Sequence, residues 1–174
     1  MHSLLVYSSM TGNTKAVAEA IVTVLPAGTP IVTVKEAPSP DKFDCLLLGF
    51  WVHRALPDPF MWRYMETVRE KNVFFFGTMA AWPDSEHACK VRDSSIEHLA
   101  GNRILDHFFC QGKLAPKRFE ARMNSSVTNA GHPMTPERKA RLIEASKHPN
   151  EEDFQKARAA VSSFLDKAGA LAKS

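Results

Sequence analysis

Short apolar runs alternate with amphipathic segments along the first 110 residues. The runs Leu4–Ser8, Cys45–Phe50 and Val73–Phe76 are continuously apolar or nearly so, and Ile31–Val34 and Ile104–Cys110 are two further candidates. Continuous runs of this length are typical of strands that are buried on both faces, as in a parallel sheet covered by helices. The pattern therefore predicts five strands.

Helical periodicity fills the gaps between these runs. Thr14–Leu25 carries its apolar residues on one stripe. Asp58-Pro59 has the form of an N-cap followed by a proline at the first helical position. Asp84 is expected to cap a third helix. The connection from Lys35 to Phe43 holds two prolines, so any helix there should be stunted. The alternation of strands and helices predicts a doubly wound α/β fold.

The pattern changes after Cys110. We expect an irregular insertion at about 111–148, with a long polar loop over Gln111–Gly131 and a short helix from Thr135 to about Lys147. A closing helix is predicted at 151–172, because Asn150 and the acids after it suit the positive end of a helix. Its core stripe should hold Phe154, Val161, Phe164 and Leu171. Residues 1–174 are thus expected to form one domain.

Composition excludes several classes of protein. Hydrophobic residues make up 44% and charged residues 24%, which is ordinary for a globular chain and unlike a disordered one. The longest apolar run is about eight residues, too short for a membrane span, and no secretory signal is expected at the start. The three cysteines include no C-x-x-C pair, so we do not expect a disulfide scaffold. We expect a cytoplasmic location instead. His87-x-Cys89 lacks further ligands, so we expect no metal site.

The charge is unevenly distributed. The first 115 residues hold 11 basic and 12 acidic residues, and the rest hold 11 basic and 7 acidic ones. Aromatic residues do not interleave with the basic ones as nucleic-acid binding would require, so we expect no nucleic-acid partner. Two interpretations stay open: a weakly basic solvated surface, and a surface for an acidic partner protein.

One strand–helix junction is rich in groups that could bind a phosphate. The first strand leads into Ser8-Ser9-Met10-Thr11-Gly12-Asn13-Thr14, and a helix follows. Backbone amides at a helix start favour anions, hydroxyls add neutral donors, and glycine allows a close approach. The P-loop and the dinucleotide fingerprint are both absent. The junction therefore favours a phosphate monoester, and an ordinary polar turn with a helix cap is the alternative.

Residues 5–21 resemble the flavodoxin signature in register. The matching positions are Leu5, Val6, Tyr7, Ser9, Gly12, Thr14, Ala18 and Ile21. This resemblance implies a five-stranded parallel sheet of order 2-1-3-4-5 with helices on both faces. It also implies that FMN binds at the carboxyl ends of the strands.

The resemblance also implies which residues bind the cofactor. The phosphate loop would be Ser9, Met10, Thr11, Gly12, Asn13 and Thr14. The flavin ring would lie between two further loops, formed by Phe50, Trp51, Val52 and His53 and by Thr78, Met79, Ala80, Ala81 and Trp82. Trp51 and Trp82 are candidates to stack on the ring, although each could equally pack in the core. His53 could donate a proton to the flavin or be a solvated loop residue.

Function follows from the same resemblance. It implies a flavodoxin-type redox protein that exchanges electrons with a partner protein, either a reductase or an acceptor enzyme. The alternative is an FMN-dependent reductase or oxidase that acts directly on a small aromatic, quinone or tetrapyrrole substrate. A flavin-free binding module is a third hypothesis, and the complete phosphate loop argues against it. The chain departs from the usually acidic flavodoxins in being basic, with His53 and Arg54 near the expected ring.

Overall fold

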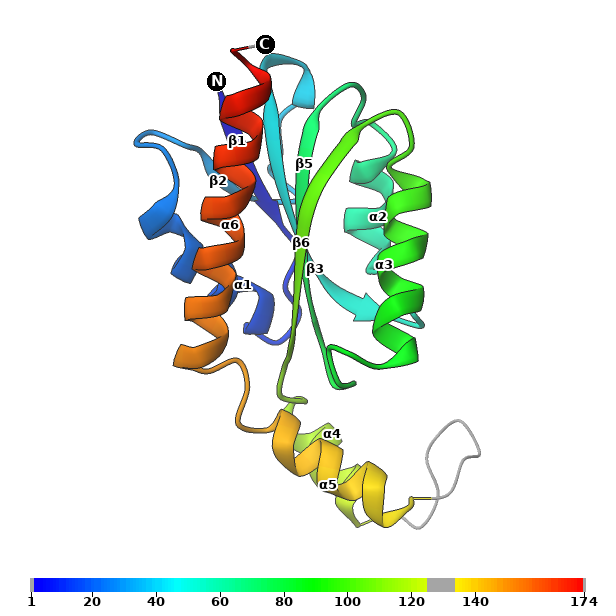
Figure 1. Ribbon diagram of the computed structural model, residues 1–174. Helices are drawn as coiled ribbons and strands as arrows, with labels where there is room; N and C mark the ends of the chain where they lie inside the picture. The colour runs from blue at the N-terminus through cyan, green and yellow to red at the C-terminus, as the bar shows by residue number, and fades with distance from the viewer. Residues whose placement is uncertain (1, 125–133, 174) are drawn as a thin grey trace.

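A parallel sheet forms the centre of the computed structural model, which describes residues 2–124 and 134–173 (Figure 1). Its strands are β1 (Ser3–Tyr7), β2 (Ile31–Thr33), β3 (Cys45–His53), β5 (Asn72–Met79) and β6 (Arg103–Gln111). They lie in the order β2-β1-β3-β5-β6, and every neighbouring pair is parallel. A two-residue strand, β4 (Leu56–Pro57), pairs antiparallel with the end of β3. Because β4 lies off this path, β5 and β6 are the fourth and fifth strands of the parallel sheet, and the predicted order 2-1-3-4-5 is confirmed.

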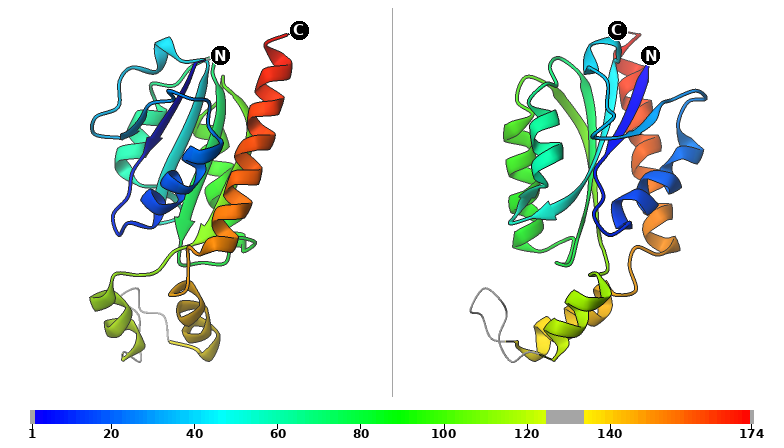
Figure 2. Two further views of the ribbon diagram at one scale, coloured as in Figure 1. Left: turned by 90° about the vertical axis from the view of Figure 1, so that its left-hand side faces the viewer. Right: turned by 180° about the vertical axis from the view of Figure 1, so that it is seen from behind.

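Helices cover both faces of the sheet (Figures 1 and 2). The helices α1 (Asn13–Ile21) and α6 (Glu151–Leu171) pack on one face. The other face is covered by α2 (Pro59–Met65) and α3 (Glu86–His98). Two short 3₁₀ turns complete this part of the chain, η1 (Val22–Val24) and η2 (Pro40–Lys42). The second turn is the stunted helix expected between Lys35 and Phe43.

Alternate residues of each central strand belong to opposite cores. In β3, Leu47 packs towards α1 and α6, whereas Leu46 and Leu48 pack towards α2 and α3. In β5, Phe74 belongs to the first core and Phe75 to the second. All five side chains are fully buried. The apolar runs are continuous because a doubly covered strand has no solvent-facing side.

Side-chain caps fix the starts of the helices. Asp58 accepts from the amides of Phe60 and Met61 at the start of α2, as the sequence predicts. Asn150 forms a capping box with Asp153 at the start of α6. The prediction that Asp84 caps the third helix is wrong. Ser85 caps α3 instead, because its hydroxyl reaches the amide three residues on while Asp84 lies one residue too early.

The described parts of the segment between β6 and α6 contain two helices, and the sequence predicts only the second of them. The predicted loop over 111–131 contains a helix, α4 (Pro116–Met123), and a second helix, α5 (Pro136–Ala145), follows. Residues 125–131 of that loop lie outside the described residues. The loop prediction failed because α4 buries no residue and so has no apolar core stripe to reveal it. Both helices project beyond the carboxyl edge of the sheet (Figures 1 and 2).

The core stripe of α6 ends earlier than predicted. Val161 and Phe164 are fully buried, and Phe154 packs against the same core. Leu171 is 41% exposed, and the last turn of α6, to which it belongs, lies at the amino edge of the sheet (Figure 1). Among the described residues, no helix combines the length and the apolar character needed to cross a membrane.

Candidate functional site

Two adjoining cavities lie at the carboxyl edge of the sheet. The first has a volume of about 550 Å³ and the second about 390 Å³, and both are lined by Met10 and Trp51. The first is completed by the β1–α1 loop, the end of β2 and the start of α2. The second is completed by the ends of β3 and β5 and by the chain after β6. The edge that the sequence predicted as the cofactor site is therefore hollowed.

The β1–α1 loop leads into a helix whose N-cap residue provides no side-chain hydrogen bond. Gly12 takes a left-handed conformation (φ +88°), and no side chain caps α1 there. Among the described residues no hydrogen-bond partner is present for the amides of Asn13 and Thr14, so these first two amides of the helix are left for solvent or a ligand. Ser9 Oγ accepts from the amide of Lys15 at 3.2 Å, and Thr11 Oγ1 accepts from Asn13 Nδ2 at 3.0 Å. Each hydroxyl keeps its own proton for another acceptor.

Buried hydrogen bonds tie this loop to the neighbouring strands. Thr14 Oγ1 and Thr78 Oγ1 lie 2.9 Å apart, and both residues are buried. Asn13 Nδ2 donates to the carbonyl of Lys113 at 2.8 Å. Gly112 is needed at this crossing, since a Cβ there would lie 2.7 Å from the Asn13 amide nitrogen. These bonds fix the start of α1 against the end of β5 and against the chain that follows β6.

A fully buried carboxyl group lies under the loop. Asp58 Oδ1 accepts from Ser8 Oγ at 2.9 Å as well as from the first amides of α2. Its other oxygen, Oδ2, is buried and has no hydrogen-bond partner within the described part of the chain. Burial raises the pKa of Asp58, and the hydrogen bonds from Ser8 and from the helix amides oppose that shift.

The end of β3 turns back as a hairpin beside the cavities. Val52 pairs with Pro57 and His53 with Leu56, so Arg54 and Ala55 form a two-residue turn. Both turn residues have positive φ (52° and 63°), as type I′ hairpin turns require. The sequence analysis does not predict this hairpin, because such turns usually contain Asn or Gly and this one contains neither. The hairpin places His53 and Arg54 on the wall of the second cavity.

Of the aromatic residues predicted to bind the flavin, Trp51 alone lines both cavities. Its ring lies edge-on to that of His53, with the centroids 5.4 Å apart. The side chain of Phe50 is fully buried and contacts the rings of Phe75 and Phe109, so its predicted contact with the flavin would be made by its backbone. The reason is the strand alternation, which turns Phe50 towards α2 and α3. Trp82 is 43% exposed and lines neither cavity.

The structure brings most of the predicted site residues together. The second cavity is lined by nine of them: Met10, Thr11, Asn13, Trp51, Val52, His53, Thr78, Met79 and Ala80. Ser9 and Gly12 line the first cavity. Thr14 lies beneath the loop on Thr78. Ala81, like Trp82, follows β5 but lines neither cavity. Stacking by either tryptophan stays a prediction.

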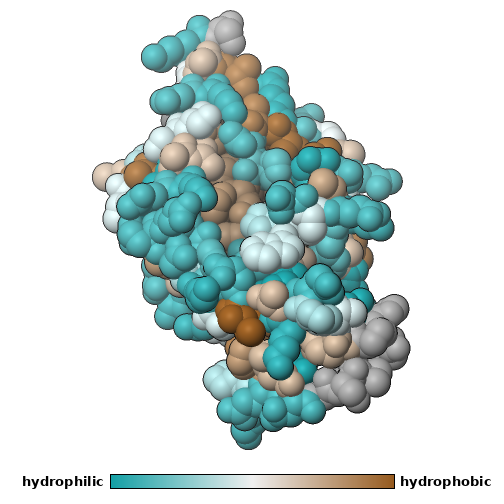
Figure 3. Space-filling model, turned by 60° about the horizontal axis from the view of Figure 1, so that its bottom comes forward, coloured by the Kyte–Doolittle hydropathy of each residue, from teal (hydrophilic) through white to brown (hydrophobic). Residues whose placement is uncertain are grey.

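Sequence reasoning missed one wall of the second cavity. This wall, which we call the α4 wall, is formed by the chain after β6 and by α4. Its residues are Gly112, Lys113, Leu114, Ala115, Arg118 and Arg122. Figure 3 shows the region from below, with mostly hydrophilic side chains and a small hydrophobic patch. Pro116 at the first helical position, followed by helix-forming residues, is the signal that could have predicted α4.

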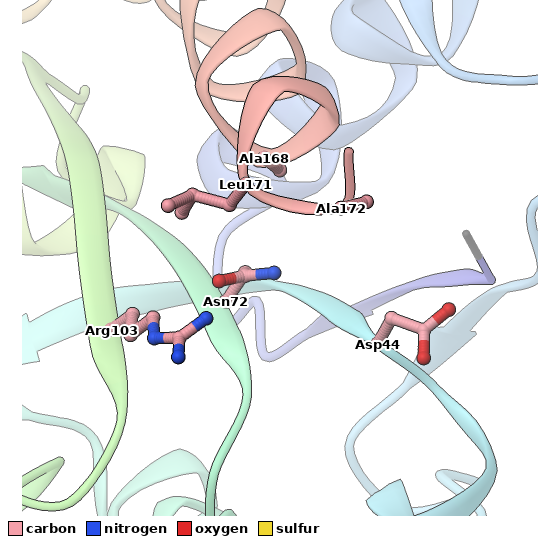
Figure 4. A pocket seen from close by; sticks show the side chains of 6 residues that line it. All are labelled: Asp44, Asn72, Arg103, Ala168, Leu171 and Ala172. Atoms are coloured by element: carbon pink, nitrogen blue, oxygen red, sulfur yellow. The ribbon is translucent and has the colours of Figure 1, made fainter. Parts of the chain in front are cut away.

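A further cavity of about 270 Å³ lies at the opposite edge (Figure 4). Asp44, Asn72 and Arg103 line it from the amino ends of the strands, and Ala168, Leu171 and Ala172 line it from the end of α6. It shares no residue with the carboxyl edge. Ligands of open α/β sheets bind at the carboxyl ends of the strands. We therefore take the two cavities there as the candidate site.

Known proteins share this fold and part of this sequence. The flavodoxin-like domain-containing protein BilS of Clostridioides difficile is 33% identical over 121 residues, which cover 66% of this chain and 68% of that protein. The flavodoxin of Streptococcus pneumoniae superposes with a TM-score of 0.60 at 13% identity, over 96% of this chain and 99% of that one.

Rubredoxin oxygen:oxidoreductase of Desulfovibrio gigas gives a TM-score of 0.61 at 11% identity, over 97% of this chain and 36% of that one. At such identities the two structural matches show the fold alone. The sequence carries the family assignment, because the family model of the flavodoxin domain matches residues 4–162. This chain is a member of the flavodoxin domain family.

Proposed function

We propose that the protein binds FMN at the carboxyl edge of the sheet and exchanges electrons with a partner protein. The observation that carries this proposal is that two features lie side by side in the two adjoining cavities. One is the uncapped start of α1 with its hydroxyl-rich loop, and the other is Trp51 with the ends of β3 and β5. Bound FMN would supply the redox chemistry, and the protein would bind it and tune it.

The donor set of the β1–α1 loop fits a phosphate monoester. The hydroxyls of Ser9 and Thr11 each have a proton to donate, and the amides of Asn13 and Thr14 are further donors at the start of α1. The helix dipole favours an anion at this end. Trp51, Val52 and Met79 offer flat or apolar surface for the flavin ring. The residues present are thus suited to both ends of the cofactor.

A second candidate function has its own support. The α4 wall extends the second cavity beyond the strand ends and adds cations to it. Such a space could hold a small substrate beside the flavin, as in an FMN-dependent reductase or oxidase. The two functions differ in whether the bound flavin reacts with small molecules directly or through a partner.

Stopped-flow spectrophotometry separates these functions. The FMN-loaded protein is mixed without oxygen with NADPH or NADH alone, and then with NADPH and a flavodoxin reductase. For an electron carrier we expect flavin bleaching to be slow with either nucleotide alone and fast with the reductase. Rapid bleaching by a nucleotide alone would contradict the carrier function and support the direct one. A purified protein that takes up no FMN would contradict both.

A further inference from the structure

Four cations and a histidine surround the second cavity. Lys113, Arg118 and Arg122 belong to the α4 wall, and His53 and Arg54 belong to the β3–β4 hairpin opposite. The four lysine and arginine side chains make no ion pair with a carboxylate within residues 2–124 and 134–173. Elsewhere, basic residues such as Lys156, Arg158 and Lys167 are paired with acids. The positive charge at the cavity is therefore not neutralised by these parts of the chain.

A further arginine stands behind this wall. Arg141 of α5 is half-buried, and its Nε is buried without a hydrogen-bond partner in the described structure. Burial lowers the pKa of Arg141, and the positive charges of Arg138 and Arg122 lower it further. The arginines of α4 and α5 thus repel one another. An anion near Arg122 would reduce that repulsion.

The charge of the whole chain is concentrated in this region. Residues 111–148 contain eight lysines and arginines and three glutamates, a net charge of +5. The complete chain carries only +3, so the rest of the molecule is slightly acidic. A positive arm beside a weakly negative body attracts anions to the mouth of the second cavity.

The same cavity also has an apolar side. Leu114 contributes apolar lining on the α4 side, and a flavin bound against Met10, Trp51, Val52 and Met79 would present the face of its own ring to the same space. A ligand that satisfies both kinds of wall must combine an apolar body with a negative group. The space is concave, as small-molecule sites are, and the α4 wall extends it beyond the strand ends where the flavin would lie.

We propose that the second cavity binds a small organic molecule with an aromatic or other apolar body and a carboxylate, and that Arg118 and Arg122 hold the carboxylate. The guanidinium group suits this role because it can donate two parallel hydrogen bonds to one carboxylate. The proposal rests on the proposed function only in placing a flavin on the strand side of the same hollow.

Calorimetric titration with two matched compounds tests the proposal. The FMN-loaded protein is titrated at low ionic strength with 2-naphthoate and with 2-naphthamide, which has the same ring system and no charge. We expect naphthoate to bind at least about tenfold more tightly, because charge-assisted hydrogen bonds are worth that much. Arg118→Gln and Arg122→Gln should each weaken naphthoate binding about tenfold and leave naphthamide binding unchanged. Both side chains are exposed on a helix that buries nothing, so the variants should fold.

Arg103→Gln is the matched control, since it removes the same charge at the opposite edge of the sheet. It should keep the full preference for naphthoate. Equal binding of the two compounds, no binding of either, or the same loss in Arg103→Gln would overturn the proposal. The cations would then serve an acidic protein surface or general solubility. If the protein takes up no FMN, the proposed function fails separately, and the same titrations on the flavin-free protein still decide the proposal.

Discussion

The buried carboxyl of Asp58 links the start of α2 to the β1–α1 loop. The sequence predicts its role as a helix cap, because Asp before Pro is a common helix start. It does not predict that the group is fully buried or that it accepts from Ser8, 50 residues away in the chain. A carboxyl group that must lose its hydration beside the candidate site should make folding depend on pH.

Asp58→Asn tests this dependence. Because the pKa is raised on folding, the folded protein binds the proton more tightly than the unfolded chain does. Stability from this group is therefore complete below the unfolded pKa of about 3.9 and falls as pH rises through the folded pKa. Asparagine keeps the accepting oxygen and does not titrate. We expect the melting temperature of Asp58→Asn, relative to the unchanged protein, to be higher at pH 8 than at pH 4.

Asp84→Asn is the matched control, since it makes the same exchange at an exposed position. A relative melting temperature of Asp58→Asn that does not change with pH, or that falls between pH 4 and pH 8, would show that the carboxyl is not held with a raised pKa.

Arg54 allows a test of flavin tuning at the residue scale. The hairpin places its guanidinium on the wall of the second cavity, where a positive charge should favour the anionic reduced flavin. We expect Arg54→Gln to lower the second reduction potential by tens of millivolts, an order of magnitude set by solvent screening of an exposed charge. Redox titration at two ionic strengths measures this. Identical potentials in both proteins would remove Arg54 from the tuning of the flavin.

Local sequence predicts the elements that carry a strong pattern. The continuous runs become β1, β3 and β5 because strands covered on both faces are apolar over most of their length. The elements that sequence missed lack such a pattern. The helix α4 has no buried side, and β4 is two residues long and follows a turn without glycine. Their positions depend on contacts with distant parts of the chain, which no local window contains.

Phe164 and Leu171 test how far the core follows α6. Both residues belong to the predicted stripe, but Phe164 is fully buried against Phe74, with ring centroids 5.6 Å apart. Leu171 is 41% exposed. We expect Phe164→Ala to lower the free energy of unfolding by about 3–5 kcal/mol and Leu171→Ala by about 0.5 kcal/mol or less. Chemical denaturation measures both, and equal losses would contradict the described end of the core.

At the scale of the molecule, some parts of the candidate site can be predicted from the sequence and others cannot. The loop at Ser9–Thr14 and the strand ends follow from the sequence, because parallel strands bring their carboxyl ends to one edge. The α4 wall does not follow, because the chain reaches this edge only after β6 has completed the sheet. The basic charge of the last third was visible, but its position beside the cavity was not.

The central claim is that the β1–α1 loop binds the phosphate of FMN, and comparison of FMN with riboflavin tests it most directly. Flavin fluorescence is followed while each compound is titrated with the flavin-free protein and with Thr11→Val, using Thr23→Val in η1 as the control. We expect the protein to bind FMN more tightly than riboflavin. Thr11→Val should weaken FMN binding by roughly tenfold to a hundredfold, because it removes a charge-assisted hydrogen bond, and should leave riboflavin binding unchanged. Equal affinity for the two flavins, or equal losses of both in Thr11→Val, would contradict the assignment.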